Sequence, residues 1–305
     1  MRARTLFRRG DGGRRPVPAP TPDLSRLLER LNPPTLARAT GHEVILHRHL
    51  AALGLSVPRL HGVIGRAGGW NASTDRPVLG PEAAGRFLAG LTDDIVVRPS
   101  AASRDDGVRV LRRDGSQFVD LEGRRHEPSA VAAEACSDPR FELFVVVGRV
   151  APHPRLRGLV PDGGLPTARL TTFVPDDGRP QVVHACLMRP APGAPGDSAT
   201  GRVIAEVDPS TGALEPPGSA PAAAWDAGDR LPDWGAACDL ARRGAALLMP
   251  QRTVAWDIAL APDGPVVVGA DSRYERIGSL RFTEALRAME RAADGGGPVT
   301  VGGAA

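Results

Sequence analysis

The chain has 305 residues, 42% of them hydrophobic, which suffices for one large or two smaller globular domains with a buried core. It contains no run of about 18 apolar residues, so we expect no membrane-spanning helix. The formal net charge is +3, and all 38 basic residues are arginine. Without lysine the chain cannot form a Schiff base or use a Walker-type phosphate lysine, so arginine must carry any cationic chemistry.

Both ends of the chain are expected to be disordered. Residues 1–20 are rich in arginine, glycine and proline and lack an apolar h-region, which indicates a basic arm rather than a signal peptide. Residues 294–305 are rich in glycine. The three cysteines, Cys136, Cys186 and Cys238, show neither metal-site nor disulfide spacing, which favours a reducing compartment, and we expect a cytoplasmic protein.

The middle of the chain is predicted to mix helices with strands. Apolar residues recur with helical spacing in some segments and form short β-branched runs in others. No regular βαβ series is visible, so we predict an α+β protein with antiparallel sheets. The expected helices cover residues 24–31, 41–53 (with Thr40 as N-cap), 81–91, 129–136, 234–248 and 280–293, and the expected strands cover residues 60–64, 95–98, 108–111, 141–147, 167–174, 182–189 and 202–207.

A β-hairpin near the C-terminus is the most informative pattern in the sequence. Two apolar, β-rich runs flank the Pro-Asp-Gly loop at residues 262–264. Proline presets φ, and Gly264 suits a left-handed position. We therefore predict a three-residue loop, in which Ala261 faces Pro265.

That register places two carboxylates on one face of the hairpin. Asp257 lies opposite Gly269 and diagonal to Asp271, so both acids project the same way with α-carbons about 7–8 Å apart. Carboxylates among valine, isoleucine and tryptophan need partners, and the pair predicts a site for a hard cation such as Mg²⁺. The alternative is that Asp257 is a hydrogen-bonded strand residue and Asp271 forms a turn at the strand end.

Three arginines in predicted strands are candidate binding residues. Arg98 ends one strand, and Arg169 stands between Thr167 and Thr171 in a polar stripe. Because a buried guanidinium needs an anion, Arg169 and Arg189 are candidates for binding a phosphate or an acidic substrate. The alternatives are an ordinary salt bridge at a strand edge for Arg98 and structural ion pairs for the other two.

Several short segments occur in an order typical of one superfamily. They are residues 54–58 (GLSVP), 95–99 (IVVRP), 152–154 (PHP), 165–172 (LPTARLTT), 185–189 (ACLMR), 204–212 (IAEVDPSTG), and 256–259 with 263–265 (WDIA and DGP). Together they resemble the ATP-grasp superfamily, and specifically its sugar-transfer-associated family. The resemblance implies an ATP-grasp fold of two α+β lobes with antiparallel sheets that clasp a nucleotide, preceded by a helical N-terminal segment.

The resemblance also implies cofactors and roles for individual residues. The cofactors are ATP and Mg²⁺, and the chemistry calls for cations around the phosphates. The expected catalytic residues are Arg169 and Arg189, which would contact phosphate or substrate, and the expected metal ligands are Asp257 and Asp271. The expected nucleotide-binding residues are Arg98 in place of the family's lysine, Gly107 in the lid, Val145 and Val147 on the adenine side, and Arg169.

The chain departs from the family pattern at telling positions. The glycine-rich lid becomes residues 101–106 and keeps only Gly107, which leaves fewer backbone donors free to close over phosphates. The family's hairpin Glu and Asn are Gly269 and Asp271 here, and a later family Asn has no clear equivalent, Ser198 being nearest. Because of these departures, a degenerate or repurposed site is an alternative to a catalytic one.

The expected function is that of an ADP-forming ligase. It would activate a small-molecule carboxylate as an acyl phosphate for attack by an amine or another nucleophile, in glycan or specialised-metabolite biosynthesis. The alternative is a catalytically degenerate relative that binds a nucleotide or metabolite, or acts as a scaffold. Nucleic-acid binding is disfavoured because only one tyrosine and seven phenylalanines could stack on bases. The sequence indicates no oligomeric state.

The expected domain organisation has five parts. They are a basic arm at residues 1–20, an N-terminal helical segment at 21–92, a small lobe at 93–149, a large lobe with the metal hairpin at 150–293, and a tail at 294–305.

Overall fold

A computed structural model describes residues 22–35, 40–101, 107–159, 164–189, 202–215 and 229–295. The predicted basic arm, lid residues 102–106, Ser198 and nearly all of the glycine-rich tail lie outside these ranges. Among the described helices, none is long and apolar enough to cross a membrane.

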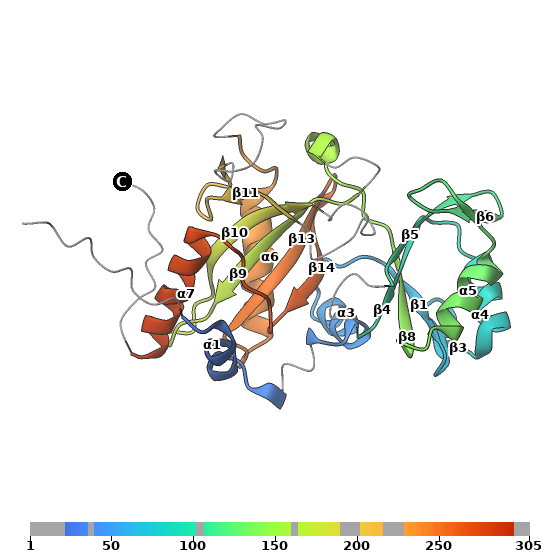
Figure 1. Ribbon diagram of the computed structural model, residues 1–305, viewed down its shortest axis with the longest axis horizontal. Coiled ribbons are helices and arrows are strands. Elements are labelled where there is room, and N and C mark those ends of the chain that lie inside the picture. The colour runs from blue at the N-terminus through green and yellow to red at the C-terminus, as the bar shows by residue number, and fades with distance from the viewer. Residues whose placement is uncertain are drawn as a thin grey trace, which may run out of the picture.

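The first half of the chain forms an eight-stranded sheet in the order β3-β2-β1-β8-β4-β5-β6-β7. Neighbouring strands are antiparallel, as predicted. Helices α4 (Gly80–Ala89) and α5 (Pro128–Ser137) pack together over one face, at the right of Figure 1. The strands are β1 (Leu60–Gly65), β2 (Gly69–Asn71), β3 (Arg76–Val78), β4 (Ile95–Pro99), β5 (Arg109–Asp114), β6 (Gln117–Val119), β7 (Arg125–His126) and β8 (Leu143–Gly148).

The other face of this sheet carries Arg98 and a cluster of valines. β4 and β8 pair so that Arg98 lies opposite Val145, and Val96 lies opposite Val147. Directly opposed residues point to the same side of a sheet, so Arg98 shares its face with both valines of β8. Val145 and Val147 are buried in a cluster that is separate from the core beneath α4 and α5.

The second half of the chain forms a six-stranded sheet in the order β12-β11-β10-β9-β13-β14. Helix α6 (Trp234–Leu247) covers one face, and α1 (Leu24–Leu31) and α7 (Leu280–Ala293) cover part of the other (Figure 1). The short helix η1 (Pro154–Leu159) lies between the two sheets in the sequence. The strands are β9 (Thr167–Phe173), β10 (Gln181–Arg189), β11 (Arg202–Val207), β12 (Leu214–Glu215), β13 (Thr253–Ala261) and β14 (Gly264–Asp271).

Strand β9 shows how this sheet separates apolar from polar side chains. Ala168 and Leu170 belong to the core beneath α6, and Phe173 belongs to the core beneath α1 and α7. Since side chains alternate along a strand, Arg169 and Thr171 point to the side of Phe173. The predicted polar stripe therefore lies on the face opposite α6.

Helix α3 (Glu43–Ala52) lies where the two sheets meet (Figure 1). Its Leu46 and Leu50 belong to the core beneath α6, whereas Val44 packs against the valine cluster of the eight-stranded sheet. The helix ends just before Gly54, which has a φ of 70° that glycine adopts without strain. The start of α3 is thus fixed against both halves of the molecule.

Thr40 does not cap this helix, contrary to the sequence prediction. The N-cap residue is His42, which makes no capping side-chain bond. The Thr40 hydroxyl instead forms a 2.7 Å hydrogen bond with the Ser272 hydroxyl, directly after β14. The Thr40 hydroxyl is therefore bound by Ser272, a residue distant in the sequence, and does not cap the helix.

The β13–β14 hairpin has the predicted pairing of its acidic strand but a different loop. Ala261 pairs with Gly264, so the connection is two residues long rather than three. A bulge at Val268 then supplies the missing residue and brings Asp257 opposite Gly269, as predicted. The predicted pairing of Asp257 with Gly269 is confirmed, but it results from a two-residue loop and a bulge and not from a three-residue loop.

The first sheet begins earlier than the predicted small lobe at residues 93–149. Strand β1 pairs with β8 from Leu60 onwards, and β2 and β3 extend the same sheet. Helix α4 packs against α5 on this sheet. The stretch from Leu60 to Ala89 is therefore part of the eight-stranded sheet and its helical layer, whereas the prediction assigned it to the helical N-terminal segment.

Candidate functional site

Four predicted site residues meet where the two sheets join, together with a fifth that the sequence did not indicate. Arg98 comes from β4, and Arg169, Asp257 and Asp271 come from β9, β13 and β14. The fifth is Glu43, the first residue of α3. The charges of Arg98 and both aspartates act on Glu43, and Arg169 interacts with both aspartates. We call these five residues the junction cluster.

Arg169 and Asp257 form a buried, two-point ion pair. They lie directly opposite each other on β9 and β13. Nε of Arg169 donates to Oδ1 of Asp257 and Nη2 donates to Oδ2, both at 2.8 Å. Their side chains are 12% and 6% exposed. Burial alone would lower the pKa of Arg169, but the charge and hydrogen bonds of Asp257 raise that pKa above its usual value. The structural ion pair considered for Arg169 is therefore present.

Asp271 ends β14 and has no arginine bound to it among the described residues. Its Oδ1 accepts a 2.7 Å hydrogen bond from the backbone N–H of Arg273, which is the turn-forming role given above as the alternative to metal binding. Burial raises the pKa of Asp271 above its usual value, and the nearby charge of Asp257 adds to this rise. Arg169 and the Arg273 N–H oppose the rise.

Arg98 connects the two sheets. Its Nη1 donates to the backbone oxygen of Val268, the bulge residue of β14, at 2.7 Å. Its Nη2 lies 2.7 Å from Oε2 of Glu43. Nε is buried and has no hydrogen-bond partner among the described residues. The salt bridge considered for Arg98 exists, although β4 lies between β8 and β5 and is not an edge strand.

Glu43 is the site residue that sequence reasoning missed. An acidic residue in the first turn of a helix is common because it stabilises the helix dipole, so nothing in the local pattern distinguishes it. In the structure, burial raises the pKa of Glu43, and the charges of Asp257 and Asp271 raise it further. Arg98 is the principal group that opposes this rise.

Two predicted site residues lie apart from the junction cluster. Arg189 ends β10, three residues after Cys186, which is opposite Arg169. An odd spacing along a strand places Arg189 on the other face from Arg169. Gly107 has a φ of 83°, and a Cβ there would lie 2.9 Å from Cγ of Pro99. Gly107 is thus required by the backbone turn, and its lid role stays a prediction.

As arranged here, the junction cluster does not fit a resident magnesium ion. Within the described residues, no group of three His, Cys, Asp or Glu side chains is placed to hold a metal. Arg169 binds both carboxylate oxygens of Asp257, and a backbone N–H binds one oxygen of Asp271. Mg²⁺ demands near-octahedral oxygen ligation, which one carboxylate bound by an arginine and a second with one oxygen hydrogen-bonded do not supply.

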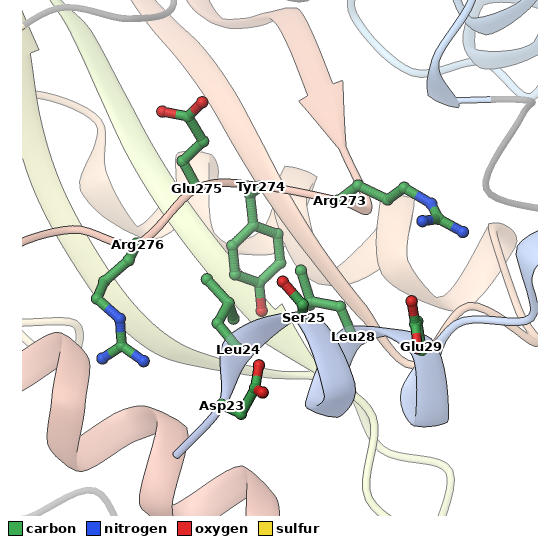
Figure 2. A pocket seen from close by; sticks show the side chains of 9 residues that line it. All are labelled: Asp23, Leu24, Ser25, Leu28, Glu29, Arg273, Tyr274, Glu275 and Arg276. Atoms are coloured by element: carbon green, nitrogen blue, oxygen red, sulfur yellow. The ribbon is translucent and has the colours of Figure 1, made fainter. Parts of the chain in front are cut away.

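A separate cavity of about 610 Å³ lies between α1 and the segment that follows β14 (Figure 2). The ring of Tyr274 projects towards α1, where Leu24 and Leu28 supply apolar wall, whereas Arg273 and Glu275 point away from the ring (Figure 2). The cavity has mixed charge at its rim, and no predicted site residue lines it.

Comparison with known proteins shows the fold. No family model matches the chain, and no curated protein sequence matches it. Among solved structures, the chain is similar to a biotin carboxylase from Campylobacter jejuni described as a β,γ-ATP complex, with a TM-score of 0.53 and 11% identity over 87% of this chain and 48% of that chain. The chain is also similar to an ADP complex of N5-carboxyaminoimidazole ribonucleotide synthetase, with a TM-score of 0.49 and 13% identity over 82% of this chain and 51% of that chain.

The chain therefore has the predicted ATP-grasp fold, with antiparallel sheets in an α+β arrangement. It spans about half the length of these two structures. At these identities the likeness shows the fold alone, so the sugar-transfer-associated family stays a prediction.

Proposed function

We propose that the protein is an ATP-dependent ligase of the ATP-grasp type, with the phosphates of ATP bound at the junction cluster. The observation that carries the proposal is the convergence of Arg98 and Arg169, from two different sheets, beside a set of carboxylates. Arginine binds phosphate by paired hydrogen bonds and keeps its charge at all accessible pH values. We place adenine near Val145 and Val147, which share the face of Arg98.

The proposed reaction forms an acyl phosphate. A substrate carboxylate oxygen would attack the γ-phosphorus, the bond from that phosphorus to the bridging oxygen would break, and ADP would leave. An amine or another nucleophile would then attack the acyl carbon and release phosphate. Such transfers are driven mainly by positioning and by charge stabilisation, which the two guanidinium groups would supply. We propose small-molecule carboxylate and amine substrates, a biosynthetic role and a cytoplasmic location.

A titration with ATP tests nucleotide binding. We expect calorimetric binding of ATP in the presence of Mg²⁺, and at 100 times the dissociation constant ATP should raise the free energy of unfolding by about 2.7 kcal/mol. ADP and phosphate are the expected products once a carboxylate and an amine are supplied together. Absence of both heat and thermal shift at millimolar ATP contradicts the proposal. Formation of AMP and pyrophosphate contradicts the ligase class.

A catalytically degenerate, nucleotide-binding relative is the second candidate. The two-point pair of Arg169 with Asp257 favours it, because it occupies the carboxylate that was predicted to bind metal. The two candidates differ in one measurement: both bind ATP, but only the ligase forms ADP when carboxylate and amine mixtures are supplied.

The response to magnesium is expected to depend on Asp271 more than on Asp257. Magnesium would arrive with the nucleotide as part of the substrate, and of Asp257 and Asp271 only Asp271 has no bound arginine among the described residues. We expect Asp271→Asn to reduce, several-fold, the ratio of ATP affinities measured with and without Mg²⁺. Asp257→Asn should chiefly lower the stability of the fold, because it removes the negative charge that is paired with the buried guanidinium of Arg169. A larger loss of magnesium dependence in Asp257→Asn would reverse this assignment.

A further inference from the structure

The guanidinium group proposed to bind phosphate already holds a carboxylate. Nη2 of Arg98 lies 2.7 Å from Oε2 of Glu43, and Nη1 is bound to the backbone of Val268. Both side chains are largely buried, at 16% and 26% exposed. A carboxylate and a phosphate oxygen use the same N–H groups of an arginine. The contact is an ion pair, since Oε2 of Glu43 has no hydrogen-bond partner among the described residues. A phosphate oxygen bound to Nη2 at this position would take the place of the Glu43 carboxylate.

The backbone around Glu43 is fixed at its N-terminal side. The N–H of Glu43 donates to the backbone oxygen of Ser100 at 2.7 Å, and the Ser100 hydroxyl lies 2.8 Å from Nδ1 of His42. Thr40 is bonded to Ser272 at the end of β14. The start of α3 is thus tied to the strand that carries Arg98 and to the hairpin that carries Asp271.

The surroundings of the Glu43 carboxylate make this contact conditional. Its charge is disfavoured by burial and by the charges of Asp257 and Asp271, and Arg98 is the main group that favours it. His42 contributes a smaller favourable effect. When a phosphate takes Arg98, Glu43 loses the main group that favours its charge, so the displacement uses part of the free energy of phosphate binding.

We infer that the Glu43 carboxylate is an internal competitor for Arg98, and that a phosphate group of the nucleotide must displace it in order to bind. The inference rests on the proposed function and names the residue that sets the affinity of this site for phosphate. It also accounts for an acidic residue among groups proposed to hold a polyanion. Without bound nucleotide, the Glu43 carboxylate is the anion that pairs with the buried guanidinium of Arg98, so this cation is not left unpaired.

The test compares Glu43→Gln with Glu82→Gln. The first change keeps the shape and removes the charge, so ATP affinity should rise about tenfold, equivalent to 1.4 kcal/mol. Inorganic tripolyphosphate affinity should rise by a similar factor, whereas adenosine affinity should not change, because only phosphate competes for Arg98. Glu82 pairs with Arg86 on the exposed face of α4 and provides the matched control, for which no change is expected. If Glu43→Gln fails to fold, Glu43→Asp withdraws the carboxylate and should give a smaller increase.

The outcomes separate the inference from the proposed function. Tighter binding of ATP and tripolyphosphate by the Glu43 variant supports the inference, including the case in which only the variant binds measurably. If the unmodified protein binds ATP and the variant binds equally or more weakly, the inference is overturned while the proposed function stands. If neither protein binds ATP or tripolyphosphate, the proposed function fails and the inference fails with it. An equal increase in adenosine affinity would mean that the substitution changes the site generally and not only the competition for Arg98, and it would also overturn the inference.

Discussion

Replacing Arg169 by alanine is expected to lower the free energy of unfolding by about 3–5 kcal/mol, the usual cost of leaving one partner of a buried pair unpaired. Asp257, whose side chain is 6% exposed in the intact pair, would lose both of its 2.8 Å hydrogen bonds. Asp271 lies nearby and adds negative charge. Urea unfolding measured by circular dichroism gives the loss directly.

Three variants make this result interpretable. Arg242→Ala removes an exposed pair with Asp239 and should cost no more than about 1 kcal/mol. Arg169→Met combined with Asp257→Leu removes both charges and should recover most of the lost stability. Arg169→Lys keeps a charge but cannot make the two-point contact, so its free energy of unfolding should lie between those of the unmodified protein and Arg169→Ala. A loss below about 1 kcal/mol for Arg169→Ala would mean that this pair contributes little to folding.

The same variants separate a ligand role of Arg169 from its structural role. If Arg169 also contacts phosphate, ATP affinity in the folded fraction should fall more for alanine than for lysine. An unchanged affinity together with a large loss of stability would leave Arg169 as a structural ion pair alone.

The sequence was sufficient to predict the strands that carry the site and the faces on which its residues lie. Arg169 shares its face with Thr171 because side-chain alternation is a local property of extended backbone. The loop of the hairpin was predicted one residue too long, and the bulge at Val268 compensated for it. A bulge depends on neighbouring contacts, and here the backbone of Val268 is held by Arg98 of the other sheet.

Contacts between distant segments could not be predicted from local pattern. The pair of Glu43 with Arg98 joins residues that are 55 positions apart, and neither residue type is unusual where it occurs. Strands β2 and β3 have three residues each, too few to show alternation, so the true start of the first sheet was missed. The ion pair of Arg169 with Asp257 follows from a strand order that the sequence pattern did not specify.

Replacing Gly244 by alanine is expected to destabilise the protein by about 1–3 kcal/mol through overpacking beneath the six-stranded sheet. A Cβ on Gly244 would lie 2.5 Å from Cη2 of Trp256, closer than carbon atoms can approach. The indole has no room to move, since Trp256 is fully buried and its Nε1 donates to Oγ1 of Thr172 at 2.9 Å. Trp256 precedes Asp257 on β13, so strain at this contact should also disturb the ion pair with Arg169.

Gly235 provides the matched control on the same helix, because a Cβ there would meet no described atom within 4 Å. Alanine is favoured over glycine within helices by about 1 kcal/mol, so Gly235→Ala should be neutral or stabilising. Gly244→Ala gains the same propensity and should still lose stability, seen as a fall in Tm of about 2–4 °C for each kcal/mol. If both variants gave equal Tm values, contact of α6 with Trp256 would not limit the packing of this sheet. A fall confined to Gly244→Ala shows that the close approach of α6 fixes the strand from which Asp257 projects.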